Sequence, residues 1–120
     1  PDYFVILHER TAWRIIDMKR TQHLPDNLRL WQGDSIGHWE GDTLVIDSIS
    51  IDERAQIRDG WFHSDQLHVI ERLRRPSKNY LEYQFTIEDP KVFSKPWTTA
   101  LRSSSPCVGG KGQGRRCCWL

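Results

Sequence analysis

The segment that most limits how this chain can fold is YLEYQFTIED, residues 80–89. Hydrophobic residues at its odd positions alternate with polar residues at its even positions from 81 to 88. A period of two places successive side chains on opposite faces of a strand, so this pattern predicts a half-buried β-strand. Asp89-Pro90 is expected to end it, because proline has no amide hydrogen to donate to a sheet.

A second segment, SIGHWEGDTLVIDSI at residues 35–49, predicts a β-hairpin. Gly41-Asp42 separates two alternating runs at a point where a tight turn favours glycine. Pairing Glu40 with Thr43 divides the other side chains between the two faces of the hairpin. Trp39, Leu44 and Ile46 then share one face, and His38, Val45 and Asp47 share the other.

The rest of the chain up to residue 100 also has the pattern of short strands. Residues 3–9 and 12–18 are rich in aromatic and β-branched residues, and residues 68–75 can pair with 80–89 through a turn at 76–79. Residues 20–34 are expected to form a long loop, and 52–58 at most one helical turn. We therefore predict an all-β fold, a small single-domain jelly-roll or cupin-like barrel or sandwich.

The chain divides by composition into a compact β-domain at residues 1–100 and a flexible tail at 101–120. The tail is rich in Ser, Gly and Arg without a hydrophobic period, and it resembles a non-native end. All three cysteines lie in it, so no disulfide is expected to hold the domain together.

Charge and motifs exclude several classes of function. With 17 Lys and Arg against 16 Asp and Glu, no basic excess indicates nucleic-acid binding. No apolar run approaches the 18 or so residues of a transmembrane helix. Phosphate-binding glycine loops of the G-x-x-x-x-G-K-[ST] and G-x-G-x-x-G types are missing from the sequence.

Histidine is the residue type that best indicates chemistry here. His23 lies in the long loop, His38 in the first hairpin, and His63 and His68 just before a strand. Imidazoles without thiolates suit copper, zinc, iron or nickel, so a shared metal site is one interpretation of these histidines. The alternative is that each only hydrogen-bonds in a loop, as His8 is expected to do on the surface.

Carboxylates offer a weaker alternative, a metal-free hydrolase that uses Glu40 or Glu71 with Asp65. Their simpler role is charge at turns and rims, where Asp42 also supports its turn and Glu71 pairs with an arginine across strands. Alternation places Glu71 on the face opposite His68, so Glu71 is not expected to be its co-ligand.

Three long strings carry a family resemblance: GDSIGHWEGDTLVID, FHSDQLHVIER and FTIEDPKVFSKPWT. Over residues 3–100 the chain resembles a family of small proteins of soil bacteria and metagenomes, most without an assigned function. It also looks like the small cupin-like copper proteins that cleave cellulose oxidatively, although the cupin H-x-H pattern is missing. That resemblance implies histidine-bound copper, a polysaccharide substrate, a homodimer and a secreted or periplasmic location.

Two hypotheses follow from these observations. The first is a copper-dependent oxidoreductase acting on cellulose or a related polysaccharide. The resemblance implies that its metal ligands are three of His23, His38, His63 and His68. Zinc, iron or manganese would suit the same ligands, and six tryptophans offer surfaces for stacking on sugar rings. The second is a non-catalytic β-barrel that binds a small apolar ligand or a glycan.

Overall fold

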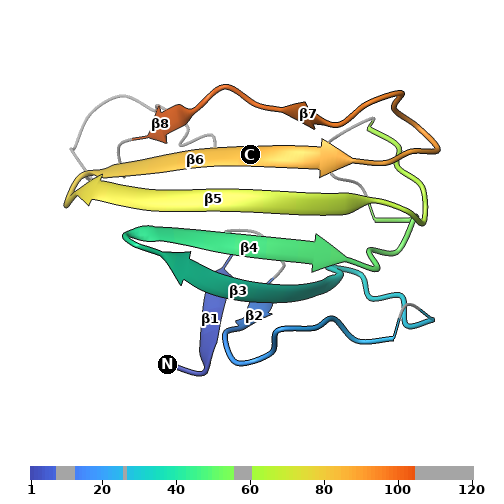
Figure 1. The fold of residues 1–120 in the computed structure, drawn as a ribbon, viewed down its shortest axis with the longest axis horizontal. Helices are drawn as coiled ribbons and strands as arrows, with labels where there is room; N and C mark the ends of the chain where they lie inside the picture. Colours follow the sequence, from blue (N-terminus) through green and yellow to red (C-terminus); the bar gives the residue numbers. More distant parts are fainter. Residues whose placement is uncertain (8–12, 26, 56–60, 105–120) are drawn as a thin grey trace, which may run out of the picture.

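A computed structural model describes residues 1–7, 13–25, 27–55 and 61–104 of the 120-residue chain (Figure 1). Every regular element among these residues is a β-strand. The strands are β1 (Tyr3–Leu7), β2 (Trp13–Asp17), β3 (Asp34–Glu40), β4 (Thr43–Ile49), β5 (His68–Ser77), β6 (Tyr80–Glu88), β7 (Trp97–Thr98) and β8 (Arg102–Ser104).

The strands form one mixed sheet in the order β1 to β7, with β8 also paired to β6, which confirms the predicted all-β class. The sheet is open and does not close into the barrel that was one expected form: β1 lies at one edge, and β7 and β8 lie along the other (Figure 1). The reason lies between β2 and β3, which pair only at Asp17 and Ile36. Pairing at a single position lets the sheet turn sharply, so the β1–β2 hairpin folds over one face instead.

The predicted hairpin is confirmed in turn and register. Glu40 pairs with Thr43 around Gly41, which has a φ of +62°. Trp39 then stands opposite Leu44, and His38 opposite Val45, on the two faces expected from alternation. The turn after β5 is shorter than predicted, because β5 continues to Ser77 and leaves only two residues before Tyr80.

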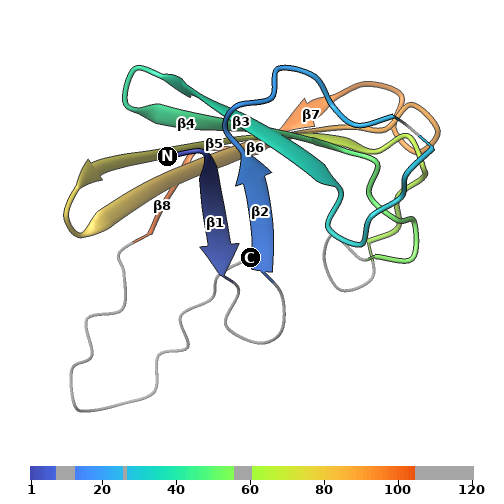
Figure 2. The same cartoon turned by 90° about the horizontal axis from the view of Figure 1, so that it is seen from below.

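The hydrophobic core lies where the β1–β2 hairpin crosses the sheet. Figure 2 shows β1 and β2 running steeply across the direction of β3 to β6. Ile16 of β2 packs with Leu44 and Ile46 of β4, and all three are buried. Phe4, Ile6, Met18 and Leu73 close the sides of this cluster. We call the face of the sheet that carries Leu44 and Ile46 the core face.

The connection at residues 18–33 crosses the opposite face of the sheet, which we call the site face. Because β2 and β3 are parallel, the chain must return from the end of β2 to the start of β3. Backbone hydrogen bonds tie this long loop to the strand ends, including Leu30 N–H to Ser50 O at 3.0 Å. Hydrogen bonds therefore hold the predicted loop at 20–34 against the end of β4. We call residues 18–33 the strap.

The sheet continues past the expected domain boundary at residue 100. Arg102–Ser104 pair with β6 from Tyr83 to Leu81, so the strand pattern reaches four residues further than the composition indicated. The rest of the expected tail, at 105–120, lies outside the described residues, as do residues 56–58 of the expected helical turn at 52–58. Its described part forms a turn, in which the Ala55 amide donates to the carbonyl oxygen of Asp52 at 2.8 Å. The described residues include no helix with the length and apolar character needed to cross a membrane.

Gly33 is a position where the fold requires glycine, and it gives a first testable prediction. Its φ is +71°, and an added Cβ would lie 2.6 Å from the carbonyl oxygen of Ile49. We expect Gly33→Ala to lower the free energy of unfolding by roughly 2–3 kcal/mol. Gly41→Ala is the matched control, because Gly41 also has a positive φ but has open space around it. If Gly33→Ala and Gly41→Ala lower the free energy of unfolding in urea by the same amount, the contact of the added Cβ with Ile49 is not the cause.

Candidate functional site

The structure brings together two of the four predicted histidines, and they meet at a carboxylate. Nε2 of His23 lies 3.1 Å from Oδ1 of Asp47, and Nε2 of His68 lies 2.8 Å from the same oxygen. Asp47 was expected on the same hairpin face as His38, but its role as the meeting point could not be read from the sequence.

Sheet register explains why these side chains converge. Asp47 on β4 is paired with Ile36 of β3 and Ile70 of β5, so His68, two residues before Ile70, projects from the same face. His23 belongs to the strap formed by residues 18–33, which lies over that face. The site therefore joins residues that are 24 and 21 positions apart from Asp47 in the sequence.

A second carboxylate orients each imidazole from its other nitrogen. Nδ1 of His23 lies 2.9 Å from Oδ2 of Asp34, and Nδ1 of His68 lies 3.1 Å from Oε2 of Glu88. Asp34 is buried, whereas Glu88 is partly exposed. Such far-side carboxylates fix the rotation of a histidine ring and make its free nitrogen more basic.

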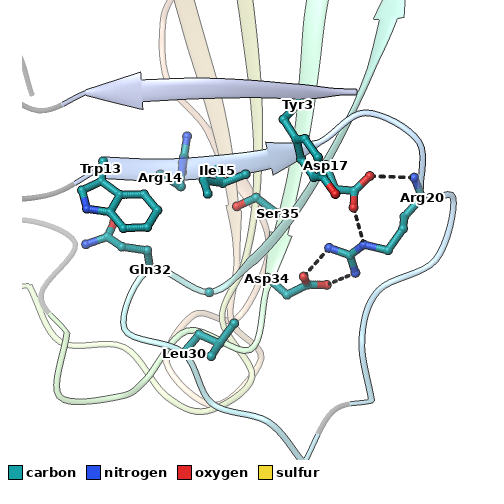
Figure 3. Close-up of a pocket in the computed structure, with 11 residues that line it drawn as sticks. Tyr3, Trp13, Arg14, Ile15, Asp17, Arg20, Leu30, Gln32, Asp34 and Ser35 are labelled. Carbon is teal, nitrogen blue, oxygen red and sulfur yellow. Dashed lines mark hydrogen bonds and ion pairs between the residues drawn. The ribbon is translucent and has the colours of Figure 1, made fainter. Parts of the chain in front are cut away.

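Arg20 holds Asp34 in place from the strap (Figure 3). Its guanidinium donates to both oxygens of Asp34, at 2.7 and 3.2 Å, and its Nε donates to Asp17 at 2.9 Å. Burial disfavours charge on Asp34, but hydrogen bonds from Arg20, the Leu24 amide and His23 outweigh it and lower the pKa to about 2. Asp34 is thus a fixed negative charge at Nδ1 of His23, on the side of the ring away from Asp47.

The cluster holds more hydrogen-bond acceptors than two neutral imidazole rings can satisfy. Each of the two rings has a carboxylate oxygen against both of its nitrogens. A neutral imidazole has only one N–H, so each neutral ring would leave one lone pair facing a carboxylate oxygen. The arrangement is satisfied either by two imidazolium rings or by a cation that replaces the two protons near Asp47.

The other two predicted histidines do not join the cluster, so the expected three-histidine set is not assembled. Nε2 of His63 lies 2.6 Å from the carbonyl oxygen of Ala55 and its Nδ1 lies 2.9 Å from that of Ser64, so both nitrogens are engaged by backbone in a buried position. His38 is exposed near the hairpin turn, where its Nε2 lies 3.3 Å from Glu40. His8 lies outside the described residues.

The carboxylates considered for a hydrolase are spread over the molecule. Glu40 binds Arg72 and Asp42 binds Arg74 in exposed cross-strand pairs, and Asp65 binds Lys91 in a loop. Each has the simpler role of surface charge pairing that the sequence offered as the alternative. Such exposed pairs contribute little to stability.

Glu71 is on the face opposite His68, as predicted, and it is buried in the core face. Nη2 of Arg14 lies 2.5 Å from its Oε2, and the Tyr83 hydroxyl donates to its Oε1 at 2.7 Å. Burial and the negative charge of Glu71 raise the pKa of Tyr83 well above its ordinary value. Glu71 thus has an arginine partner, but Arg14 comes from β2, which lies over the core face and is not a neighbour of β5 in the sheet, and the ion pair is buried.

A groove of about 290 Å³ opens next to the cluster (Figure 3). The Arg20–Asp34 pair lies at one end of the groove, and Trp13 and Gln32 lie at the other. Tyr3, Ile15 and Leu30 contribute further apolar surface to the lining. The groove thus combines an exposed aromatic ring with charged and amide groups, and its charged end contacts His23 through Asp34.

The charge state of His68 gives a second testable prediction. The hydrogen bond to Asp47 raises the pKa of His68 in spite of its partial burial, and Glu88 adds to this effect. The folded protein therefore holds this proton more tightly than the unfolded chain. The resulting stabilisation is complete below about pH 6.5 and is lost as the pH rises through the raised pKa.

Urea denaturation of chelator-treated protein at a series of pH values measures this effect. We expect the free energy of unfolding to fall above about pH 6.5, and we expect His68→Asn to remove much of that fall. The control is His38→Asn, which removes an exposed imidazole and is expected to keep the slope. A slope that is equal in both variants would contradict a special role for His68.

No group of three or more His, Cys, Asp or Glu side chains among the described residues is already arranged around one point as a metal site. His23 and His68 nevertheless converge on one oxygen of Asp47. Comparisons of the sequence and structure with protein-family models, curated proteins and solved structures gave no match.

Proposed function

We propose that the protein is a metal-dependent oxidoreductase whose ion is held by Nε2 of His23, Nε2 of His68 and the carboxylate of Asp47, with copper as the expected ion. One observation carries the proposal. Two imidazoles point at a single carboxylate oxygen while Asp34 and Glu88 orient their far nitrogens. A divalent cation at this point would satisfy the lone pairs that neutral rings direct toward Asp47.

The donor set suits a redox-active ion, although it differs from the three histidines predicted at first. Two imidazoles and one carboxylate leave other coordination positions open, a set well known for iron, and copper leads the divalent series in affinity for such ligands. The same set also accommodates zinc. Binding requires Asp47 to shift from its hydrogen bonds, and its side chain is about a third exposed, which leaves room for such a movement.

The chain's own contribution is to bind and to orient. Arg20 fixes Asp34, and Asp34 and Glu88 in turn fix the two rings, so the ligand nitrogens are held before any ion arrives. A bound redox-active ion would supply electron transfer to oxygen or peroxide, which protein side chains alone do not provide. The partial exposure of the cluster leaves it open to a large substrate.

The proposed substrate is a polysaccharide such as cellulose. Trp13 is 62% exposed and forms one wall of the groove whose other end is Asp34. An indole ring presents a flat apolar face beside a polar N–H, which suits the apolar faces and hydroxyl groups of a sugar. We infer that Trp13 holds a sugar unit near the cluster through this groove.

Copper titration of chelator-treated protein tests the metal site. We expect one equivalent of Cu(II) with a nitrogen-ligated electron paramagnetic resonance signal, and release of protons as the ion binds. Lack of a stoichiometric nitrogen-ligated signal would rule out the copper site. Elemental analysis of the protein as purified distinguishes copper from iron, zinc and manganese.

Activity is tested separately, by release of soluble oxidised sugars from cellulose in the presence of a reductant. We expect release from the copper-loaded protein and none after chelation. A second candidate function, non-catalytic binding of a glycan or small apolar ligand, is favoured by the groove at Trp13. It would be indicated by binding that survives chelation without any turnover.

A further inference from the structure

Four aromatic rings form a connected series from the interior of the core face to the surface. The ring centroid of Tyr83 lies 5.7 Å from that of Phe85, and the centroid of Phe85 lies 5.6 Å from that of Trp97. Trp97 in turn lies 5.7 Å from Trp61, which is 43% exposed. Centroids about 4.5–7 Å apart belong to rings in direct contact. We call these four residues the aromatic series.

The sheet explains how the four rings come to lie in a row. Tyr83 and Phe85 are two residues apart on β6, so both project from the core face. Trp97 belongs to β7, where it pairs with Ile87, the next residue of β6 on that face. Trp61 lies in the segment before β5 and meets Trp97 from outside the sheet. The series therefore follows β6 inward from an exposed indole to a phenol in the interior.

The interior end of the aromatic series has a proton acceptor in place. The Tyr83 hydroxyl donates to Oε1 of Glu71 at 2.7 Å, within reach of direct proton transfer. Arg14 binds the other carboxylate oxygen, which leaves Oε1 directed at the phenol. The raised pKa of Tyr83 keeps the phenol protonated as long as it is not oxidised. Removal of an electron reverses this preference, because an oxidised phenol is a strong acid.

We propose that Tyr83 is a redox-active tyrosine and that Trp97 and Trp61 pass its electron to the surface. A one-electron oxidant in solution takes an electron from the indole of Trp61, Trp97 then reduces Trp61, and Tyr83 reduces Trp97. Phe85 is not oxidised and only fills the space between Tyr83 and Trp97.

The step at Tyr83 moves one electron and one proton in different directions. The electron goes to Trp97, the phenol O–H bond breaks, and the proton moves to Oε1 of Glu71, which leaves a neutral tyrosyl radical. A reductant at the surface reverses the sequence, and Glu71 returns the proton. The fold thus stores one oxidising equivalent away from solvent. This inference goes beyond the proposed function and does not depend on the metal cluster.

Flash photo-oxidation of the chelator-treated full chain by a ruthenium–bipyridine complex with an electron-accepting quencher tests the proposal. The chain has three tyrosines, so Tyr3→Phe with Tyr80→Phe leaves Tyr83 as the only source of a tyrosyl radical. We expect a tyrosyl signal by electron paramagnetic resonance in this background, and its complete loss when Tyr83→Phe is added. A background protein that gives no tyrosyl signal would overturn the proposal.

Trp61→Phe in the same background tests the path to the surface. We expect most of the tyrosyl signal to be lost, because a phenyl ring is far harder to oxidise than an indole. Trp31→Phe is the matched control: Trp31 is 59% exposed but lies on the strap, outside the aromatic series, so the signal is expected to remain. Equal signals in the two variants would show that Trp61 is not on the path.

Circular dichroism shows whether each variant folds, and Trp61→Leu replaces Trp61→Phe if the latter does not. The rate of radical formation in deuterated solvent tests the role of Glu71 without a substitution. We expect the radical to form more slowly there, because the phenol O–H bond breaks in the same step. Equal rates in both solvents would contradict proton transfer to Glu71 in that step.

Discussion

Replacing Asp47 with asparagine is expected to lower copper affinity by at least ~100-fold, the largest functional effect that this structure predicts. Asparagine keeps the size of the side chain but removes the negative charge on which His23 and His68 converge. The loss should exceed that of Asp34→Asn, because Asp34 acts only through the far nitrogen of His23. Isothermal titration of chelator-treated protein with Cu(II) measures both.

Glu40→Gln is the control for this experiment. Glu40 is an exposed carboxylate near His38, on the same face of the β3–β4 hairpin as Asp47. The substitution therefore removes one charge without altering the cluster of His23, His68 and Asp47. We expect copper affinity to change by less than about threefold, because solvent and salt screen a charge on the surface. If Asp47→Asn and Glu40→Gln have the same effect, Asp47 is not a ligand.

Replacing Glu71 with alanine is expected to have the largest effect on stability, a loss of about 3–5 kcal/mol in the free energy of unfolding. The change leaves the buried guanidinium of Arg14 without its counter-charge and the Tyr83 hydroxyl without its acceptor. Within the described residues, Nε of Arg14 already lacks a hydrogen-bond partner, so the remaining interactions cannot compensate. Urea denaturation measures the loss.

The double variant Arg14→Met with Glu71→Leu separates the cost of an orphaned charge from the value of the pair. Both residues are replaced by apolar side chains of similar volume, and such exchanges of buried ion pairs are often neutral or stabilising. We therefore expect the double variant to recover much of the lost stability. A double variant as unstable as Glu71→Ala would mean that packing, rather than the unpaired charge, explains the loss.

Local patterns predicted much of the sheet. Alternation fixed β6 to within one residue at its end, because Asp89-Pro90 cannot extend the ladder. The Gly41 turn fixed the register of β3 and β4, since a short turn allows one pairing in which Leu44 and Ile46 are buried. The sharp turn of the sheet after β2 was not predicted, because it depends on a single contact between distant segments.

Residue types indicated which chemistry the site could support, but not which of the four histidines belong to it. All four candidate histidines looked alike in sequence, since each lay in or near a loop. Backbone carbonyls engage both nitrogens of His63, and solvent surrounds His38, whereas carboxylates gather around His23 and His68. These differences arise from partners on other strands, which no local spacing reveals.

The sequence by itself therefore determined the first six strands, the faces that they bury and the side chains that can carry chemistry, because these properties depend on near neighbours. The short strands β7 and β8, which exist through pairing with β6, were not predicted. Only the tertiary structure decided which of those side chains meet. The parallel pairing of β2 and β3 sends residues 18–33 back across the sheet, and this places His23 over Asp47 and beside His68. The same turn of the chain folds the β1–β2 hairpin over the core and leaves its outer face exposed.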